Sequence, residues 1–152
     1  MNPGFLTAPV YLEALRRWRA PSSFIIFLVF FVILVIGKGV SFVRLGELVE
    51  ALGLEALVPG DPNREVAGGY VSDLLSDVMA HARSGAIWVT IQTHQNVVAV
   101  ASLLSLAGVV VAGGYRPDAG TLAKAAEEGV PVYAAADSSF AVAGRLYGLG
   151  LR

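Results

Sequence analysis

Residues 88–115 form the segment that most restricts what this chain can fold into. An apolar strand ends there in a polar turn at residues 92–96, and an apolar helix follows. A second strand, residues 109–111, is apolar throughout and ends at Gly113 and Gly114. Strands that are apolar on both faces are typical of parallel sheets covered by helices. Small ligands bind such sheets where the strands end, so this β-α-β unit predicts an α/β module with its polar groups along one edge.

Length and composition exclude several classes of protein. A chain of 152 residues is long enough for one domain with a real core. Its net charge of −1 gives no basic excess for binding nucleic acid. The absence of cysteine excludes disulfides, thiolate zinc sites, cysteine-ligated iron–sulfur clusters and a cysteine nucleophile. Charged residues make up 15% of the chain, against roughly 25% in ordinary soluble domains.

Part of that deficit comes from residues 24–36, which contain no polar side chain and follow Arg16, Arg17 and Arg19. As a helix this segment would span about 20 Å, which is short of the ~30 Å hydrocarbon core of a bilayer. Its flanking residues extend it to a marginal length. The segment shows no amphipathic period, so we expect an apolar helix that is separate from the domain downstream.

Three interpretations of residues 1–42 remain open. The segment could anchor the chain in a membrane, with the preceding arginines on the cytoplasmic side. It could be a secretory signal, although no convincing cleavage site of small residues follows. Residues 1–42 could also lie before the natural start, because the sequence from Val43 onward resembles the beginning of a small domain. We therefore predict an extension, 1–42, and a domain, 43–152, in a cytoplasmic protein whose attachment to a membrane stays open.

The rest of the chain alternates strands and helices. Residues 45–52 carry leucine and valine at helical spacing. Strands are then expected at 64–67, 86–91, 108–112 and 130–135, and helices at 71–83, 96–106, 117–128 and 138–149. We expect Leu74, Leu75, Val78 and Met79 on the buried side of the first of these four helices. The alternation predicts a three-layer α/β fold: a mostly parallel sheet of about four strands with helices on both faces.

Polar residues and glycine pairs follow the predicted strands, and they form the candidate site. Backbone N–H groups at the start of a helix favour an anion. The alternative is that Thr93 or Asn96 only caps the helix and that His94 is a solvated turn residue. Since parallel strands end at one edge, the turns should form a small crevice. The candidate ligand-binding residues are Gly68, Gly69, Gln92, Thr93, His94, Asn96, Gly113, Gly114, Asp137 and Ser138.

Two other groups have simpler explanations. Asp73, Asp77 and His81 recur at a spacing of four residues and would share a helix face. Acids in the first turns of a helix are favoured by its dipole, so no metal site is predicted. The four aromatic residues of the strands and the last helix are expected in the core or in a dimer contact: Trp88, Tyr133, Phe140 and Tyr147.

Three stretches, 68–82, 89–118 and 129–150, together resemble the DRTGG domain family. That family is similar to the N-terminal domain of HPr kinase/phosphorylase, and it also occurs inside some phosphotransacetylases and CBS-domain pyrophosphatases. The resemblance covers residues 43–152. The family's Asp-Arg pair would fall at Gln92-Thr93-His94, where this chain has neither residue. Its Thr-Gly-Gly would fall at Ala112-Gly113-Gly114, which keeps only the glycines.

The resemblance implies a small regulatory or assembly domain, often dimeric. Stand-alone forms resemble products encoded near iron-only hydrogenase and NADH-dependent electron-transfer genes of anaerobic bacteria, and they are often labelled as kinases of the HPr protein. Kinase activity is not expected here, because a P-loop needs G-x-x-x-x-G-K-[ST]. The chain's Gly-Lys pair, Gly37-Lys38, is followed by Gly39, and Val32 stands where the first glycine is needed.

The predicted function is therefore non-catalytic. We expect a homodimeric regulatory or assembly domain, without a cofactor, that binds a small anionic ligand (a nucleotide or a phosphometabolite) or a partner protein such as a redox enzyme. No interaction with nucleic acid is expected. Two alternatives stay open: a phosphotransfer protein that uses His94 as the acceptor, and a scaffold tethered to a membrane through residues 24–36.

Overall fold

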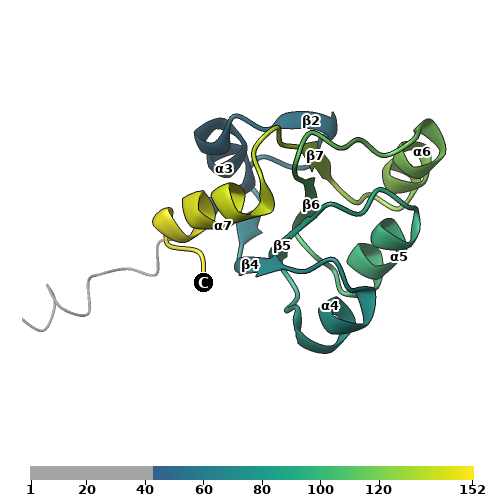
Figure 1. Cartoon of the computed structure of the whole chain (residues 1–152), viewed down its shortest axis with the longest axis horizontal. Helices are drawn as coiled ribbons and strands as arrows, with labels where there is room; N and C mark the ends of the chain where they lie inside the picture. Colours follow the sequence, from purple (N-terminus) through teal and green to yellow (C-terminus); the bar gives the residue numbers. More distant parts are fainter. Residues whose placement is uncertain (1–42) are drawn as a thin grey trace, which may run out of the picture. The chain divides into compact units, whose positions relative to one another are not determined.

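A five-stranded sheet organises residues 43–152, the part of the chain that the computed structural model describes (Figure 1). The strands lie in the order β2, β7, β6, β5, β4. The last four are parallel to one another, and β2 is antiparallel to β7. Their bounds are β2 (Glu55–Val58), β4 (Gly68–Val71), β5 (Ala86–Thr90), β6 (Gly108–Val111) and β7 (Val132–Ala134). Two short strands, β1 (Val43–Arg44) and β3 (Glu65–Val66), form a separate antiparallel pair.

Helices cover both faces of the sheet, which confirms the predicted three-layer α/β fold (Figure 1). On one face lie α3 (Leu45–Leu52) and α7 (Ser139–Gly148). On the other lie α4 (Leu75–His81), α5 (Asn96–Leu103) and α6 (Ala119–Glu127). The predicted extension, residues 1–42, lies outside the described residues together with its apolar segment. Within 43–152, no helix is both long enough and apolar enough to cross a bilayer.

Two apolar cores lie on the two faces of the sheet, and strand alternation divides the residues between them. Ile87 and Val89 of β5 point into the core under α3 and α7. Ala86 and Trp88 belong to the core under α4, α5 and α6. All four are buried, and full burial of a large apolar side chain stabilises the fold by about 1.5–3 kcal/mol. The alternation thus explains why β5 is apolar along its whole length.

Helix α3 coincides with the predicted segment because its apolar side chains repeat at helical spacing. Leu45, Leu48 and Leu52 are buried. The helix ends at Gly53, whose φ of 64° is left-handed and favours glycine. Capping also determines where two later helices begin. Ser138 caps α7, and Asp118 caps α6 one position after Pro117, so this proline precedes the helix instead of lying in its first turn.

The predicted helix at 71–83 is too long at its start. Val71 ends β4, and α4 begins only at Leu75. Val78 is buried, whereas Leu74 and Met79 are 64% and 50% exposed, so the expected buried side was wrong for these two residues. Side-chain bonds hold the connecting loop in a non-helical shape. The Trp88 indole N–H donates to the backbone oxygen of Ser72 over 2.8 Å.

Strand β2 was not predicted. Its sequence, EALV, shows no clear alternation, and its burial runs from exposed to half-buried. It lies at the edge of the sheet and pairs with β7 through an irregular register. Edge strands need no fully apolar pattern, because only one side of the backbone is paired and part of the strand faces water.

Candidate functional site

The carboxyl ends of the parallel strands meet at one edge of the sheet, as predicted. Thr90 at the end of β5 pairs with Val111 of β6, which pairs in turn with Ala134 of β7. Since β2 is antiparallel, it contributes its first residue, Glu55, to the same edge. Eight of the ten candidate residues follow these strand ends: Gln92, Thr93, His94, Asn96, Gly113, Gly114, Asp137 and Ser138.

Gly113 and Gly114 join the loops that follow β6 and β7. The Gly113 N–H donates to the Asp137 carbonyl oxygen over 2.7 Å, and the Gly114 N–H donates to Ala135 over 2.9 Å. Both glycines have a left-handed φ, 77° and 75°. A Cβ built at Gly113 would lie 3.9 Å from the Ile91 side chain, just beyond β5. These loops therefore touch, and glycine is required where they do.

Helix α5 has Gln95 at its N-cap position without a side-chain cap bond, so the alternative that Thr93 or Asn96 caps it was wrong, and His94 bonds to its first turn instead. The Asn96 N–H donates to His94 Nδ1 over 3.3 Å, and the Val97 N–H donates to the His94 carbonyl oxygen over 2.9 Å. A ring nitrogen that accepts an N–H carries no proton, so the proton of the neutral ring is on Nε2. The side chain is exposed, and Nε2 is the nitrogen left for a ligand.

A carboxylate that is not among the predicted candidate residues, Asp118, lies near His94. Asp118 caps α6, and its Oδ1 accepts the Thr121 N–H over 2.7 Å. This hydrogen bond is the main cause that lowers the pKa of Asp118, and His94 lowers it further when its ring is protonated. The two residues are far apart in sequence, and parallel pairing of β5 with β6 brings them to the same edge. The sequence signal was Pro117-Asp118 directly before a helical pattern.

Asp73 belongs to this edge and not to a face of α4. Its Oδ1 accepts the Thr90 hydroxyl and the Ile91 N–H, each over 2.8 Å. Asp73 thus joins the end of β4 to the end of β5. The expected stripe of Asp73, Asp77 and His81 does not form, because Asp73 precedes the helix. Among residues 43–152, no three His, Asp or Glu side chains lie together as a metal site would need.

A hollow of about 180 Å³ lies at this edge beside Gly114. We call it the edge hollow. Apart from alanines, its lining residues are Gly53, Glu55, Gly114 and Arg116. The Arg116 guanidinium binds Glu55 with both terminal nitrogens, one of them over 2.9 Å, and these bonds are the main cause that lowers the pKa of Glu55. Neither residue was a candidate in the sequence, because their pairing depends on the unpredicted strand β2.

Asp137 and Ser138, the candidate residues that follow β7, form hydrogen bonds with other parts of the protein. Asp137 Oδ2 accepts from the Arg145 guanidinium over 3.0 Å, and Arg145 also donates to the Ala51 carbonyl oxygen over 2.7 Å. Ser138 Oγ accepts the Ala141 N–H at the start of α7 over 3.3 Å. Both arginines that approach this edge, Arg116 and Arg145, are therefore paired with carboxylates.

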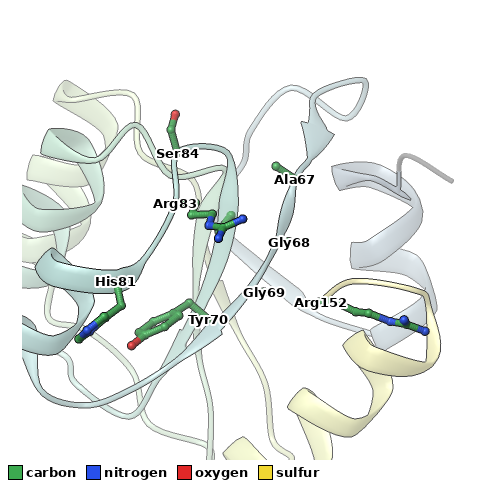
Figure 2. A pocket seen from close by; sticks show the side chains of 9 residues that line it. Ala67, Gly68, Gly69, Tyr70, His81, Arg83, Ser84 and Arg152 are labelled. Carbon is green, nitrogen blue, oxygen red and sulfur yellow. The ribbon is translucent and has the colours of Figure 1, made fainter. Parts of the chain in front are cut away.

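Gly68 and Gly69 lie at the opposite end of the sheet, which corrects their predicted place. They begin β4 instead of following a strand, and they pair with Ala86 and Ile87 at the start of β5. The short β-like run before the two glycines had predicted a strand at 64–67 that ends in a turn. Both glycines line a larger pocket, of about 590 Å³, beside β4 (Figure 2).

Comparison with known proteins supports the fold. No family model matches the chain, and no curated protein matches it significantly. Among solved structures, it is similar to the crystal structure of the CBS and DRTGG domains of the regulatory region of Clostridium perfringens pyrophosphatase, in complex with the activator diadenosine tetraphosphate. The TM-score is 0.60 at 19% identity, over 72% of this chain. The similarity covers 47% of the solved chain, about half its length. At this identity the comparison establishes a shared fold.

Proposed function

We propose that residues 43–152 are a regulatory domain of the DRTGG type that binds a small phosphate-containing ligand, a nucleotide or a phosphometabolite. One observation carries this proposal: the loops after β5, β6 and β7 meet, and the edge hollow opens beside them with an arginine in its wall. Two comparisons support it. The sequence resembles the DRTGG family, and the similar solved structure belongs to a regulatory region in complex with a nucleotide activator.

The ligand's phosphate would bind Arg116, which is the cation that lines the edge hollow. Guanidinium recognises phosphate through two parallel hydrogen bonds. Glu55 now occupies those donors, so the phosphate must replace this carboxylate. The hollow has room for a phosphate or a sugar but not for a whole nucleotide, since drug-sized ligands fill about 300–1,000 Å³. The remainder of the ligand would lie along the exposed loop of His94.

This competition gives a test in which two substitutions act in opposite directions. Isothermal titration of the full chain with AMP, ATP and inorganic phosphate should detect binding. Arg116→Ala should abolish it, whereas Glu55→Gln should strengthen it severalfold, because the phosphate no longer displaces a charged competitor. Lys124→Ala is the control, since it removes another surface ion pair, with Glu128. The proposal fails if Arg116→Ala binds as tightly as the unmodified chain.

The alternative of phosphotransfer through His94 has one supporting observation, the Asp118 carboxylate near the imidazole. The Asn96 N–H occupies Nδ1, so the phosphoryl group would be carried on Nε2. Incubation with labelled phosphoryl donors, followed by acid hydrolysis, would test this function. His94→Ala should remove the label, and Asn96→Ala, which keeps the backbone N–H, should not.

The remaining expectations stay predictions. Light scattering would detect a homodimer. A gene for a redox enzyme beside the gene for this chain would support a redox-enzyme partner. Tethering through residues 24–36 concerns a segment outside the described residues. Membrane fractionation, with the intact N-terminus read by mass spectrometry, would distinguish a tether from a misassigned start.

A further inference from the structure

A second pocket, larger than the edge hollow, lies beside β4 at the opposite end of the sheet. We call it the β4 pocket. Its volume is about 590 Å³, within the range of small-molecule sites. Strand β4 is the last strand of the sheet and pairs only with β5, so one side of its backbone is open. The lining residues are Ala67, Gly68, Gly69, Tyr70, His81, Arg83, Ser84, Ala86 and Arg152.

One wall of the β4 pocket is held in place by Asp77. The Tyr70 hydroxyl donates to Asp77 Oδ2 over 2.8 Å, and His81 Nδ1 lies 3.0 Å from Asp77 Oδ1. Figure 2 shows the Tyr70 ring and the His81 side chain pointing toward each other. Both rings are thus fixed before any ligand arrives. A planar ligand group can stack on a fixed aromatic ring with little loss of entropy.

Arg83 provides a positive charge without a partner. Within residues 43–152 its guanidinium makes no hydrogen bond and no ion pair, and its side chain extends from the loop toward β4 (Figure 2). Arg152 is different, because its side chain points away from the pocket and its guanidinium lies 5.3 Å from the Tyr147 ring centre. No acidic side chain lines the pocket. The nearby Asp77 carboxylate does not line it and already contacts Tyr70 and His81.

We infer that the β4 pocket is a second binding site, for a nucleotide-sized anion with a planar ring, whose ring stacks on Tyr70 and whose phosphate binds Arg83. Gly68 is buried against the Arg152 carbonyl oxygen, whereas Gly69 is only half-buried and has no side chain, so the edge of the ring can reach the β4 backbone beside Gly69. An extended peptide could also pair with an open strand edge. Pairing of that kind requires neither an unpaired guanidinium nor a fixed aromatic ring, so these two features favour the small anion.

The test titrates the full chain with AMP, adenosine and inorganic phosphate and follows backbone amide NMR signals. AMP should shift the amides of Gly69, Tyr70 and Ser84. Arg83→Ala should weaken this binding at least tenfold, and Arg83→Lys should restore part of it. Arg83 is exposed, so these variants leave the core intact. Arg64→Ala is the control, because Arg64 donates to Ser105 in a neighbouring loop and does not line the pocket.

Two further variants separate this site from the edge hollow. Tyr70→Leu should weaken AMP and adenosine alike, whereas Tyr70→Phe should keep most of the affinity. Arg116→Ala should leave the shifts at β4 unchanged even if it abolishes binding at the other edge. The inference is overturned if Arg83→Ala binds AMP as the unmodified chain does. Shifts confined to the edge hollow, no shift with any probe at millimolar concentration, or shifts along β4 with acidic peptides alone would also overturn it.

Discussion

Gly113 shows how single residues hold the candidate site together. Its N–H bridges to the loop after β7, and its left-handed φ of 77° lets the chain turn there. Similar single contacts occur along the same edge. Asp73 joins two strand ends, and the His94 ring accepts a backbone N–H at the start of α5. Each of these residues uses its polar group inside the protein, so the loops are already fixed before a ligand binds.

Replacing Gly113 should therefore destabilise the domain. Gly113→Ala places a Cβ about 3.2 Å from the Tyr115 ring at a left-handed φ, which costs about 1–2 kcal/mol for an ordinary residue. Urea unfolding would measure this loss. Gly144→Ala is the matched control, because Gly144 lies in α7 with open space around its Cβ position, and alanine there should stabilise the fold by about 0.5–1 kcal/mol. Equal effects at both positions would contradict the prediction.

The pKa of Asp118 gives a second prediction at this scale. Its folded pKa lies below the usual value of 3.8 because the Thr121 N–H binds the carboxylate. The charged form thus stabilises the fold above that value, and the stabilisation is lost as the pH falls through the lowered folded pKa. Asp118→Asn keeps the cap but does not titrate. Its thermal midpoint should therefore fall less than that of the unmodified chain between about pH 5 and about pH 2.5. If the thermal midpoints of the two proteins fell by the same amount over this pH range, the prediction would be contradicted.

Residue-scale features were only partly predictable. Eight of the ten candidate residues follow strand ends at one edge, because strand direction alone places them there. The hydrogen bond from the Asn96 N–H to the His94 ring was missed, since it depends on a ring orientation that no sequence pattern encodes. Asp118 and Arg116 were also missed. Their neighbours His94 and Glu55 are distant in sequence and come close only through the pairing of strands.

At the scale of elements, prediction worked where a repeat was regular and failed at the edges of the sheet. Helix α3 was predicted to the residue because its leucines repeat at helical spacing. Strand β4 was displaced, since Gly68 and Gly69 are typical of turns and Val71 continued the apolar pattern of the helix. Strand β2 was missed because it is half exposed. Both errors concern edge strands, whose sequences are the least constrained by burial.

The beginning of β6 is closely packed against its neighbours. A Cβ at Gly108 would lie 3.2 Å from the Pro131 carbonyl oxygen and 3.3 Å from Ile87 Cδ1. Gly108→Ala should therefore cost about 1–3 kcal/mol, because neither neighbour can move freely. Gly69→Ala is the control from β4, where the nearest atom, Leu146 Cδ1, lies at an ordinary 3.9 Å. Urea unfolding of both variants checks this, and a larger loss for Gly69→Ala would contradict it.

At the scale of the molecule, the fold follows from alternation of apolar strands with helices, and this part of the prediction was confirmed. The sheet has one apolar core on each face, and both cores are formed by side chains of residues 43–152. Ligand chemistry could not be predicted in the same way. It depends on which charges remain unpaired after folding, and the sequence does not show that Arg116 is paired while Arg83 is not.

The proposed domain boundary leads to a prediction about the whole chain. A protein shortened to residues 43–152 should fold alone, because both cores are built from its own strands and helices. It should unfold in one cooperative thermal transition, within roughly 5 °C of the corresponding transition of the full chain. Calorimetry of both proteins would measure this. A broad transition in the shortened chain, without a heat-absorption peak, would show that residues 1–42 are needed for folding.

The burial of Trp88 has a practical consequence. Its indole is shielded from water in the core on one face of the sheet, and its N–H is bonded to the loop that leaves β4. Indole fluorescence depends strongly on such surroundings, and the sequence contains one other tryptophan, Trp18. With Trp18 replaced by phenylalanine, the emission of the protein becomes an internal optical probe of that loop. Movement there could then be followed in real time without attaching a dye.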